Sequence, residues 1–212
     1  KVTAMVTKEN NEKAISDLFI RTGRIQYIII AFILTGFVVF GKSFIRLWAG
    51  SDYEDAYGIT LCFFIPMTVP LIQNLGIIIL QARNQMKFRS TLYVVIAFVS
   101  LVISIPLSKQ YGGIGCAISI ALALTTGQII VMNIYYHRVI HIDILDFWKE
   151  IGKMSLVPFA IGSLSFYLFC IYEIHTVQIF IVCIFAFSCI YVPLFWFFGM
   201  NAYEKELFVS PV

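Results

Sequence analysis

The apolar stretch IPMTVPLIQNLGIIILQA, residues 65–82, contains amide side chains and prolines that could do chemistry inside a membrane. On a helical projection these positions, with one asparagine just beyond them, fall within a single stripe about 100° wide. Amides in hydrocarbon are costly unless they meet hydrogen-bond partners or water, and each proline leaves a backbone carbonyl with the same need. The chemistry that these amides and carbonyls can perform is therefore hydrogen bonding to polar groups. The stripe consists of Pro66, Pro70, Gln73, Asn74, Gln81 and Asn84.

Two interpretations of this stripe remain open. In the first, the amides make hydrogen bonds between helices in a static bundle. In the second, which we favour, they line a wet cavity, and Pro66 and Pro70, four residues apart, make the helix bendable. A bendable helix beside a cavity suits alternating access.

Covalent catalysis and metal chemistry have little support in the sequence. Asp52, Glu54 and Asp55 cluster in one tight turn, which is typical of solvated loop charges rather than of a catalytic set. His137 and His141 are four residues apart, but no carboxylate or thiol at helical spacing completes a metal site. Phosphate-binding loops, nucleophile elbows and zinc motifs are absent from the sequence. We therefore expect no metal, no cofactor and no enzymatic activity.

The composition indicates an all-α integral membrane protein. Hydrophobic residues make up 60% of the 212 residues, charged residues only 13%, and the mean hydropathy is +0.89. Six apolar runs, uncharged apart from Lys42, are each long enough to cross a bilayer as a helix and lack the alternation of β-barrel strands. About six transmembrane helices are therefore predicted, over residues 25–45, 59–82, 90–108, 112–136, 154–172 and 177–200.

The basic residues predict the orientation of these spans. If the loops alternate sides, one side holds twelve Lys and Arg residues and the other holds only Lys42, Arg46 and Lys109. The positive-inside rule then places both ends and the loops 83–89 and 137–153 in the cytoplasm. The net charge of +3 follows from this topology, and no soluble basic face for nucleic acid is present.

The predicted organisation has five parts. Residues 9–22 and 142–153 have an apolar face at helical spacing, which predicts amphipathic helices on the cytoplasmic surface. The parts are a cytoplasmic amphipathic connector (1–24), a four-helix transmembrane core (25–136), a cytoplasmic connector (137–153), two peripheral transmembrane helices (154–200) and a cytoplasmic tail (201–212).

The fourth span carries a second pattern, in which small residues recur every four positions. Such a stripe lets another backbone approach closely, so it predicts tight packing. Gln128 and Asn133, further along the same helix, are candidates to extend the wet lining towards the cytoplasm. The small residues are Gly115, Ser119, Ala123 and Gly127.

Several stretches, in order and over residues 1–150, resemble one protein family. They are RTGRIQ (21–26), FGKSFIRLWAGSDYEDAY (40–57), PLIQNLGIIILQARNQMKFRS (70–90), IPLSKQYGGIGCAI (105–118) and NIYYH followed by IDILDFWK (133–149). Together they resemble the C-terminal half of bacterial Wzx-type oligosaccharide flippases, in the multidrug/oligosaccharidyl-lipid/polysaccharide exporter superfamily. Beyond residue 150 the similarity is one of hydropathy alone.

The resemblance implies the second lobe of a two-lobe MATE-like transporter in the bacterial inner (plasma) membrane. Such a transporter flips undecaprenyl-pyrophosphate-linked oligosaccharide from the cytoplasmic to the periplasmic leaflet, for O-antigen of lipopolysaccharide, capsule or exopolysaccharide assembly. Its implied partners are the lipid-linked oligosaccharide, membrane lipids, a polysaccharide polymerase and a chain-length regulator. The opening KVTAM, which has no initiating methionine or signal peptide, fits a chain that begins within a longer protein.

The resemblance also implies a set of substrate-path residues. The amides would exchange hydrogen bonds with sugar hydroxyls, and the arginines would neutralise the pyrophosphate in a low-dielectric path. For the arginines, the alternative is topology setting and contact with lipid headgroups. The implied residues are Arg24, Gln26, Gln73, Asn74, Gln81, Asn84 and Arg89, with Pro66 and Pro70 as flexing points.

Two other functions remain as alternatives, beside a structural membrane subunit with no transport path. A multidrug or cation antiporter of the same superfamily would be expected to have an acidic residue in its cavity, and the six predicted spans contain none. A membrane polysaccharide polymerase or ligase would be expected to have a large outer loop, whereas the predicted outer loops are short.

Overall fold

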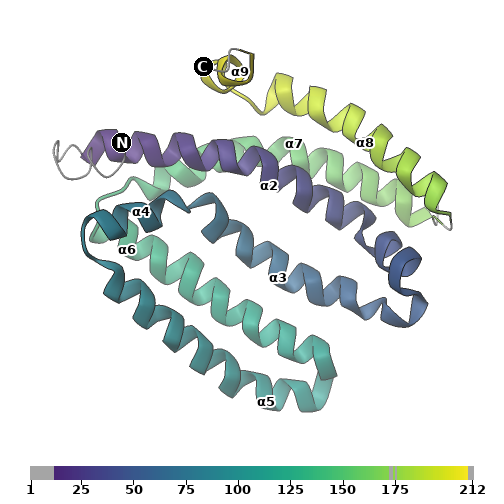
Figure 1. Ribbon diagram of the computed structural model, residues 1–212, viewed down its shortest axis with the longest axis horizontal. Coiled ribbons are helices and arrows are strands. Elements are labelled where there is room, and N and C mark those ends of the chain that lie inside the picture. Colours follow the sequence, from purple (N-terminus) through teal and green to yellow (C-terminus); the bar gives the residue numbers. More distant parts are fainter. Residues whose placement is uncertain (1–11, 172–173, 175, 210–212) are drawn as a thin grey trace. The chain divides into compact units, whose positions relative to one another are not determined.

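The computed structural model describes residues 12–171, 174 and 176–209, and within these ranges the chain forms helices and no strand (Figure 1). Five helical segments in the described part are long and apolar enough to cross a membrane. The prediction of an all-α, multi-pass membrane protein is confirmed. The elements are α2 (Glu12–Ala49), η1 (Ser51–Tyr53), α3 (Asp55–Ile72), α4 (Leu75–Ala82), α5 (Met86–Leu124), η2 (Thr125–Val131), α6 (Met132–Arg138), α7 (Ile144–Ile171), α8 (Val177–Phe198) and α9 (Ala202–Val209).

One of the five segments, Met86–Arg138, is 53 residues long and contains two of the predicted spans. A straight helix of that length would measure about 80 Å, far more than one bilayer crossing requires. The chain instead reverses at Gly112, whose backbone angles (φ 60°, ψ −137°) strongly favour glycine. Figure 1 shows α5 turning back so that its second part runs antiparallel to its first. The predicted spans 90–108 and 112–136 thus form a helical hairpin.

The expectation of one continuous helix over residues 59–82 is wrong. The helix α3 ends at Ile72, α4 begins at Leu75, and a turn separates them. Beyond the break, the Gly76 N–H donates to the Gln73 carbonyl (2.9 Å) and the Ile77 N–H to the Asn74 carbonyl (3.0 Å), three residues back instead of four. The helical projection used for the stripe therefore does not hold beyond Ile72.

The two predicted amphipathic connectors are not separate surface helices. The described part of the first (residues 12–22) is the beginning of α2, which continues to Ala49 because no proline or positive-φ residue interrupts it. Residues 9–11 lie outside the described residues. The second connector is part of α7, which runs from Ile144 through most of the predicted span 154–172.

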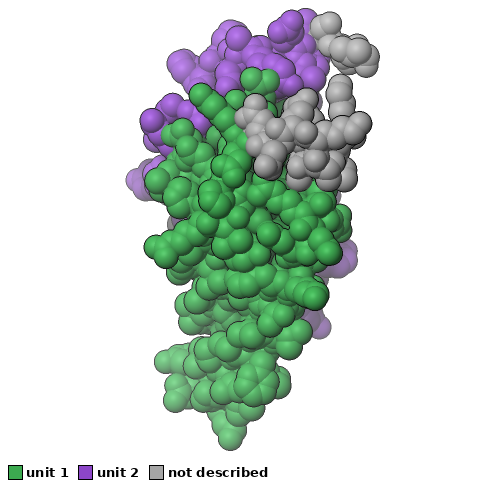
Figure 2. Space-filling model, turned by 90° about the vertical axis from the view of Figure 1, so that its left-hand side faces the viewer, with its two compact units in different colours: residues 1–26, 58–148 green, residues 27–57, 149–212 purple. Residues whose placement is uncertain are grey.

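The chain divides into two compact units (Figure 2). Unit 1 contains residues 1–26 and 58–148, and unit 2 contains residues 27–57 and 149–212. These units differ from the predicted segments, because most of the first span belongs to the same unit as the last two. In unit 2, the Phe40 ring lies 5.0 Å from that of Phe169 and 5.5 Å from that of Phe187, centroid to centroid. These aromatic contacts join α2 to α7 and α8.

The small-residue stripe of the fourth span packs the hairpin of unit 1 tightly, as predicted. A Cβ atom on Gly115 would overlap the backbone carbonyl of Leu107, and one on Gly127 would overlap the side chain of Ile96. Between them, Ser119 is fully buried and Ala123 is 6% exposed. The absence of side-chain bulk lets the two arms of the hairpin meet.

Candidate functional site

Polar side chains from the turn between α3 and α4, from α5 and from α6 lie together in unit 1. We call this group the polar cluster and define it as Gln73, Arg89, Tyr93, Asn133 and Tyr136. Gln73 lies in the break between α3 and α4, Arg89 and Tyr93 are one turn apart on α5, and the other two are on α6. The break and the hairpin together position these side chains.

Gln73 is satisfied by protein groups. Its side chain is 3% exposed, and its Nε2 donates to Asn133 Oδ1 over 2.7 Å. The Nδ2 of Asn133 in turn donates to the carbonyl of Ile129 over 2.6 Å. For Gln73 the structure therefore favours the first interpretation, interhelical hydrogen bonding, in this conformation.

Arg89 is a buried cation with neutral partners. It is 7% exposed, and its two Nη atoms donate to the hydroxyls of Tyr136 (3.2 Å) and Tyr93 (3.1 Å). Its Cζ also lies 5.3 Å from the centroid of the Tyr93 ring. A guanidinium has five N–H donors, and a buried charge normally has an oppositely charged partner. The partners of Arg89 leave its charge without such compensation.

Gln128, in the hairpin of unit 1, is a second buried polar residue whose hydrogen bonding is incomplete. Its side chain is 3% exposed and its Nε2 has no acceptor. It lies in η2, a seven-residue π-helix, a form that is rare and is frequently found at functional sites. A buried amide donor without an acceptor costs about 1–3 kcal/mol, so a bound acceptor would be favourable here.

The other predicted stripe residues do not share one environment. Pro66 is buried and Pro70 partly buried, whereas Asn74, Gln81 and Asn84 are exposed. Asn84 has a positive φ of 54° and belongs to the turn between α4 and α5. Because α3 ends at Ile72 and α4 begins at Leu75, these residues do not lie on one continuous helix. The roles proposed for these side chains stay predictions.

Arg24 and Gln26 lie on the part of α2 that belongs to unit 1. Arg24 is 6% exposed. With its amide oriented to suit its neighbours, Gln26 donates through Nε2 to the carbonyls of Leu71 (3.1 Å) and Ile72 (3.2 Å). These carbonyls stand at the end of α3, and the N–H of Gly76, which would bond Ile72 in a continuous helix, goes to Gln73 instead. Gln26 thus caps the broken helix.

Replacing Gln26 by leucine is expected to lower the free energy of unfolding by about 1–3 kcal/mol, since a helix-end carbonyl loses its donor. The measurement is unfolding in detergent micelles followed by circular dichroism. The matched control is Gln110→Leu, because Gln110 is exposed. Equal stability of the two variants would show that the cap contributes nothing.

Part of the cluster was not predicted. The spacing of Arg89 and Tyr93, one helical turn apart, was a signal that could have paired them. Tyr136 gave no such signal, because the sequence does not distinguish it from the adjacent Tyr135. Only the fold shows that Tyr136 is the tyrosine buried against Arg89.

The acidic turn near the start of α3 is only partly solvated. Asp52 and Asp55 are exposed, as expected. Glu54 instead accepts from Arg46, at 2.7 Å from Nε and 2.6 Å from an Nη, and its other oxygen lies 3.3 Å from Lys42 Nζ. Its side chain therefore belongs to an ion-pair group on unit 2.

Comparison of the chain with family models, curated proteins and solved structures finds no match. The assignment of a function therefore depends on the residues themselves and on their geometry. Over the described residues, no three His, Cys, Asp or Glu side chains are grouped closely enough to hold a metal ion. Among the groups of unit 1 that a ligand would complete are Arg89, whose partners are neutral, and Gln128, whose Nε2 has no acceptor; the Oε1 of Gln85 is also buried without a donor.

Proposed function

We propose that the chain is part of a bacterial inner-membrane flippase for undecaprenyl-pyrophosphate-linked oligosaccharide, working by alternating access. It would carry repeat units from the cytoplasmic to the periplasmic leaflet for O-antigen, capsule or exopolysaccharide assembly. In this proposal the chain supplies one lobe, both ends are cytoplasmic, and the protein catalyses no covalent reaction.

The observation that carries the proposal is the buried guanidinium of Arg89. Its partners are two neutral tyrosine hydroxyls and one aromatic ring. It lies at the start of α5, next to the turn 83–85, which the basic residues predict to be cytoplasmic. A pyrophosphate group entering from the cytoplasmic side would supply the missing negative charge, and arginine suits it because the planar guanidinium bonds two phosphate oxygens at once.

The exposed amide side chains near the start of α5 and in or next to α4 could exchange hydrogen bonds with the glycan. Asn74, Gln81 and Asn84 are exposed and keep donors and acceptors that match sugar hydroxyls. Gln73 and Asn133, which bond each other, would form the wall behind them in this conformation. The pattern supports binding of a polyol by several weak contacts and does not specify one sugar.

Deleting the full-length gene tests this function. We expect loss of surface polysaccharide, with lipid-linked repeat units retained on the cytoplasmic leaflet, and restoration by the reintroduced gene. Leaflet position is measured by accessibility of the glycan to a membrane-impermeant lectin in spheroplasts. If the repeat units reach the periplasm and stay unpolymerised, the flippase proposal is wrong and a polymerase is favoured.

A further inference from the structure

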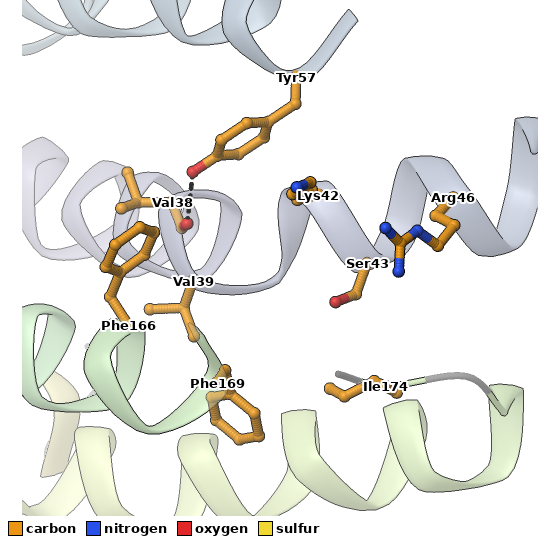
Figure 3. A pocket seen from close by; sticks show the side chains of 9 residues that line it. All are labelled: Val38, Val39, Lys42, Ser43, Arg46, Tyr57, Phe166, Phe169 and Ile174. Carbon is orange, nitrogen blue, oxygen red and sulfur yellow. Dashed lines mark hydrogen bonds between the residues drawn. The ribbon is translucent and has the colours of Figure 1, made fainter. Parts of the chain in front are cut away.

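Unit 2 contains a cavity of about 200 Å³ with one polar and one apolar wall (Figure 3). The helix α2 supplies Lys42, Ser43 and Arg46, which form the polar wall. Phe166 and Phe169, near the end of α7, form the apolar wall. Figure 3 shows the two phenyl rings below and to the left of Lys42 and Arg46, with Ser43 turned towards Ile174.

The polar wall is held in place by hydrogen bonds and ion pairs. At its edge, the Tyr57 hydroxyl donates to the Val38 carbonyl over 2.7 Å, which fixes the start of α3 beside α2. One oxygen of Glu54 accepts from Arg46 and the other lies 3.3 Å from Lys42 Nζ. The Lys42 side chain is 58% exposed, and Glu54 accepts only one of its three ammonium donors. Lys42 therefore has donors left for a ligand in the cavity.

The surroundings place this cavity at the membrane–water interface. Lys42 is the charged residue that interrupts the end of the first apolar run. Nearly two turns further along α2, Trp48 is 80% exposed and stacks on Phe44, with the ring centroids 5.9 Å apart. Exposed tryptophan next to a lysine at the end of a span is typical of the headgroup region, where lipid phosphates lie.

We propose that this cavity binds a membrane phospholipid. The phosphate bonds Lys42 and the Ser43 hydroxyl, and the first carbons of an acyl chain lie against Phe166 and Phe169. A ligand for this cavity should be amphipathic, because Lys42 and Ser43 suit an anionic group and the two phenyl rings suit an apolar group. The bilayer contains such molecules at the depth of the headgroups. The carboxylate of Glu54 competes with the phosphate for Lys42. This inference concerns unit 2 and does not depend on the proposed flippase activity.

The test uses the full chain, phosphatidylglycerol as the probe, and native mass spectrometry to titrate bound lipid. Replacing Lys42 by glutamine is expected to weaken phosphatidylglycerol binding about fivefold, the effect of losing one cation at a lipid surface. Lys42→Arg should keep the affinity, because the charge is retained. Lys109→Gln is the matched control, since Lys109 is an exposed lysine in the other unit.

A third variant separates lipid binding from a merely structural ion pair. Glu54→Gln removes the competing carboxylate, so it is expected to tighten phosphatidylglycerol binding while Lys42→Gln weakens it. A structural role for the ion pair would change binding in the same direction in both variants. Unchanged binding in Lys42→Gln would overturn the proposal. Competition by inorganic phosphate at equal concentration would also overturn it, because the site would then take a free anion.

Discussion

Replacing Arg89 by glutamine is expected to reduce flipping of lipid-linked repeat units about 30-fold or more, since a desolvated charge contact to the pyrophosphate would be lost. Flipping is measured as complementation of the deletion strain and as lectin accessibility of the glycan. The buried guanidinium has only neutral partners in the protein, so its removal leaves no unpaired carboxylate behind. The variant should therefore remain folded.

The matched control for Arg89 is Lys87→Gln. Lys87 lies two residues earlier on α5 and is exposed, so this change removes one positive charge from the same end of the helix without touching the polar cluster. If both variants lose flipping equally, the effect is one of membrane orientation or surface charge. If Arg89→Gln flips normally at a wild-type protein level, Arg89 is a packing residue and the observation carrying the proposed function fails.

Replacing Gly115 by alanine is expected to lower the free energy of unfolding by about 1–3 kcal/mol, the range typical of overpacking a filled interior. The added Cβ would overlap the backbone carbonyl of Leu107, and backbone yields less readily than the end of a flexible side chain. The helical hairpin of unit 1 would then have to open near its turn. Thermal unfolding in micelles provides the measurement.

Gly113→Ala is the control for that prediction. Gly113 is two residues from Gly115 in the same helix, and a Cβ there would lie 3.5 Å from Ile59, an ordinary contact. Because alanine has the higher helix propensity, this control should be neutral or slightly stabilising. Similar destabilisation of both variants would mean that the turn tolerates no added atoms, and close approach at Gly115 would not be the cause.

The all-α, multi-pass character was predictable because it depends on runs of apolar residues. Residues 90–108 and 112–136 are separated by the short stretch 109–111, the second run begins with two glycines, and the structure turns at the first of them, Gly112. The extent of each helix was less predictable. Residues 12–22 and 144–153 continue into the following spans. An amphipathic segment and the transmembrane segment after it can form one helix when no residue between them breaks it.

The break after Ile72 shows why the candidate site was only partly predictable. Helical periodicity assumes an unbroken helix, and under that assumption Gln73 and Asn74 fall within the same stripe about 100° wide. In the structure Gln73 is buried and bonded to Asn133, while Asn74 is exposed. The carbonyl that a continuous helix would have used is capped by Gln26 from another helix. No local pattern encodes that contact.

The sequence by itself determined that this is an all-α, multi-pass membrane protein and that its fourth span packs through small residues, because hydropathy and residue size act locally along a helix. Only the tertiary structure decided which polar side chains are buried together. Arg89 and Tyr136 are 47 positions apart, and Gln73 and Asn133 are 60 positions apart. Their pairing depends on how the hairpin turns at Gly112 and where α3 ends, and both are set by packing between helices.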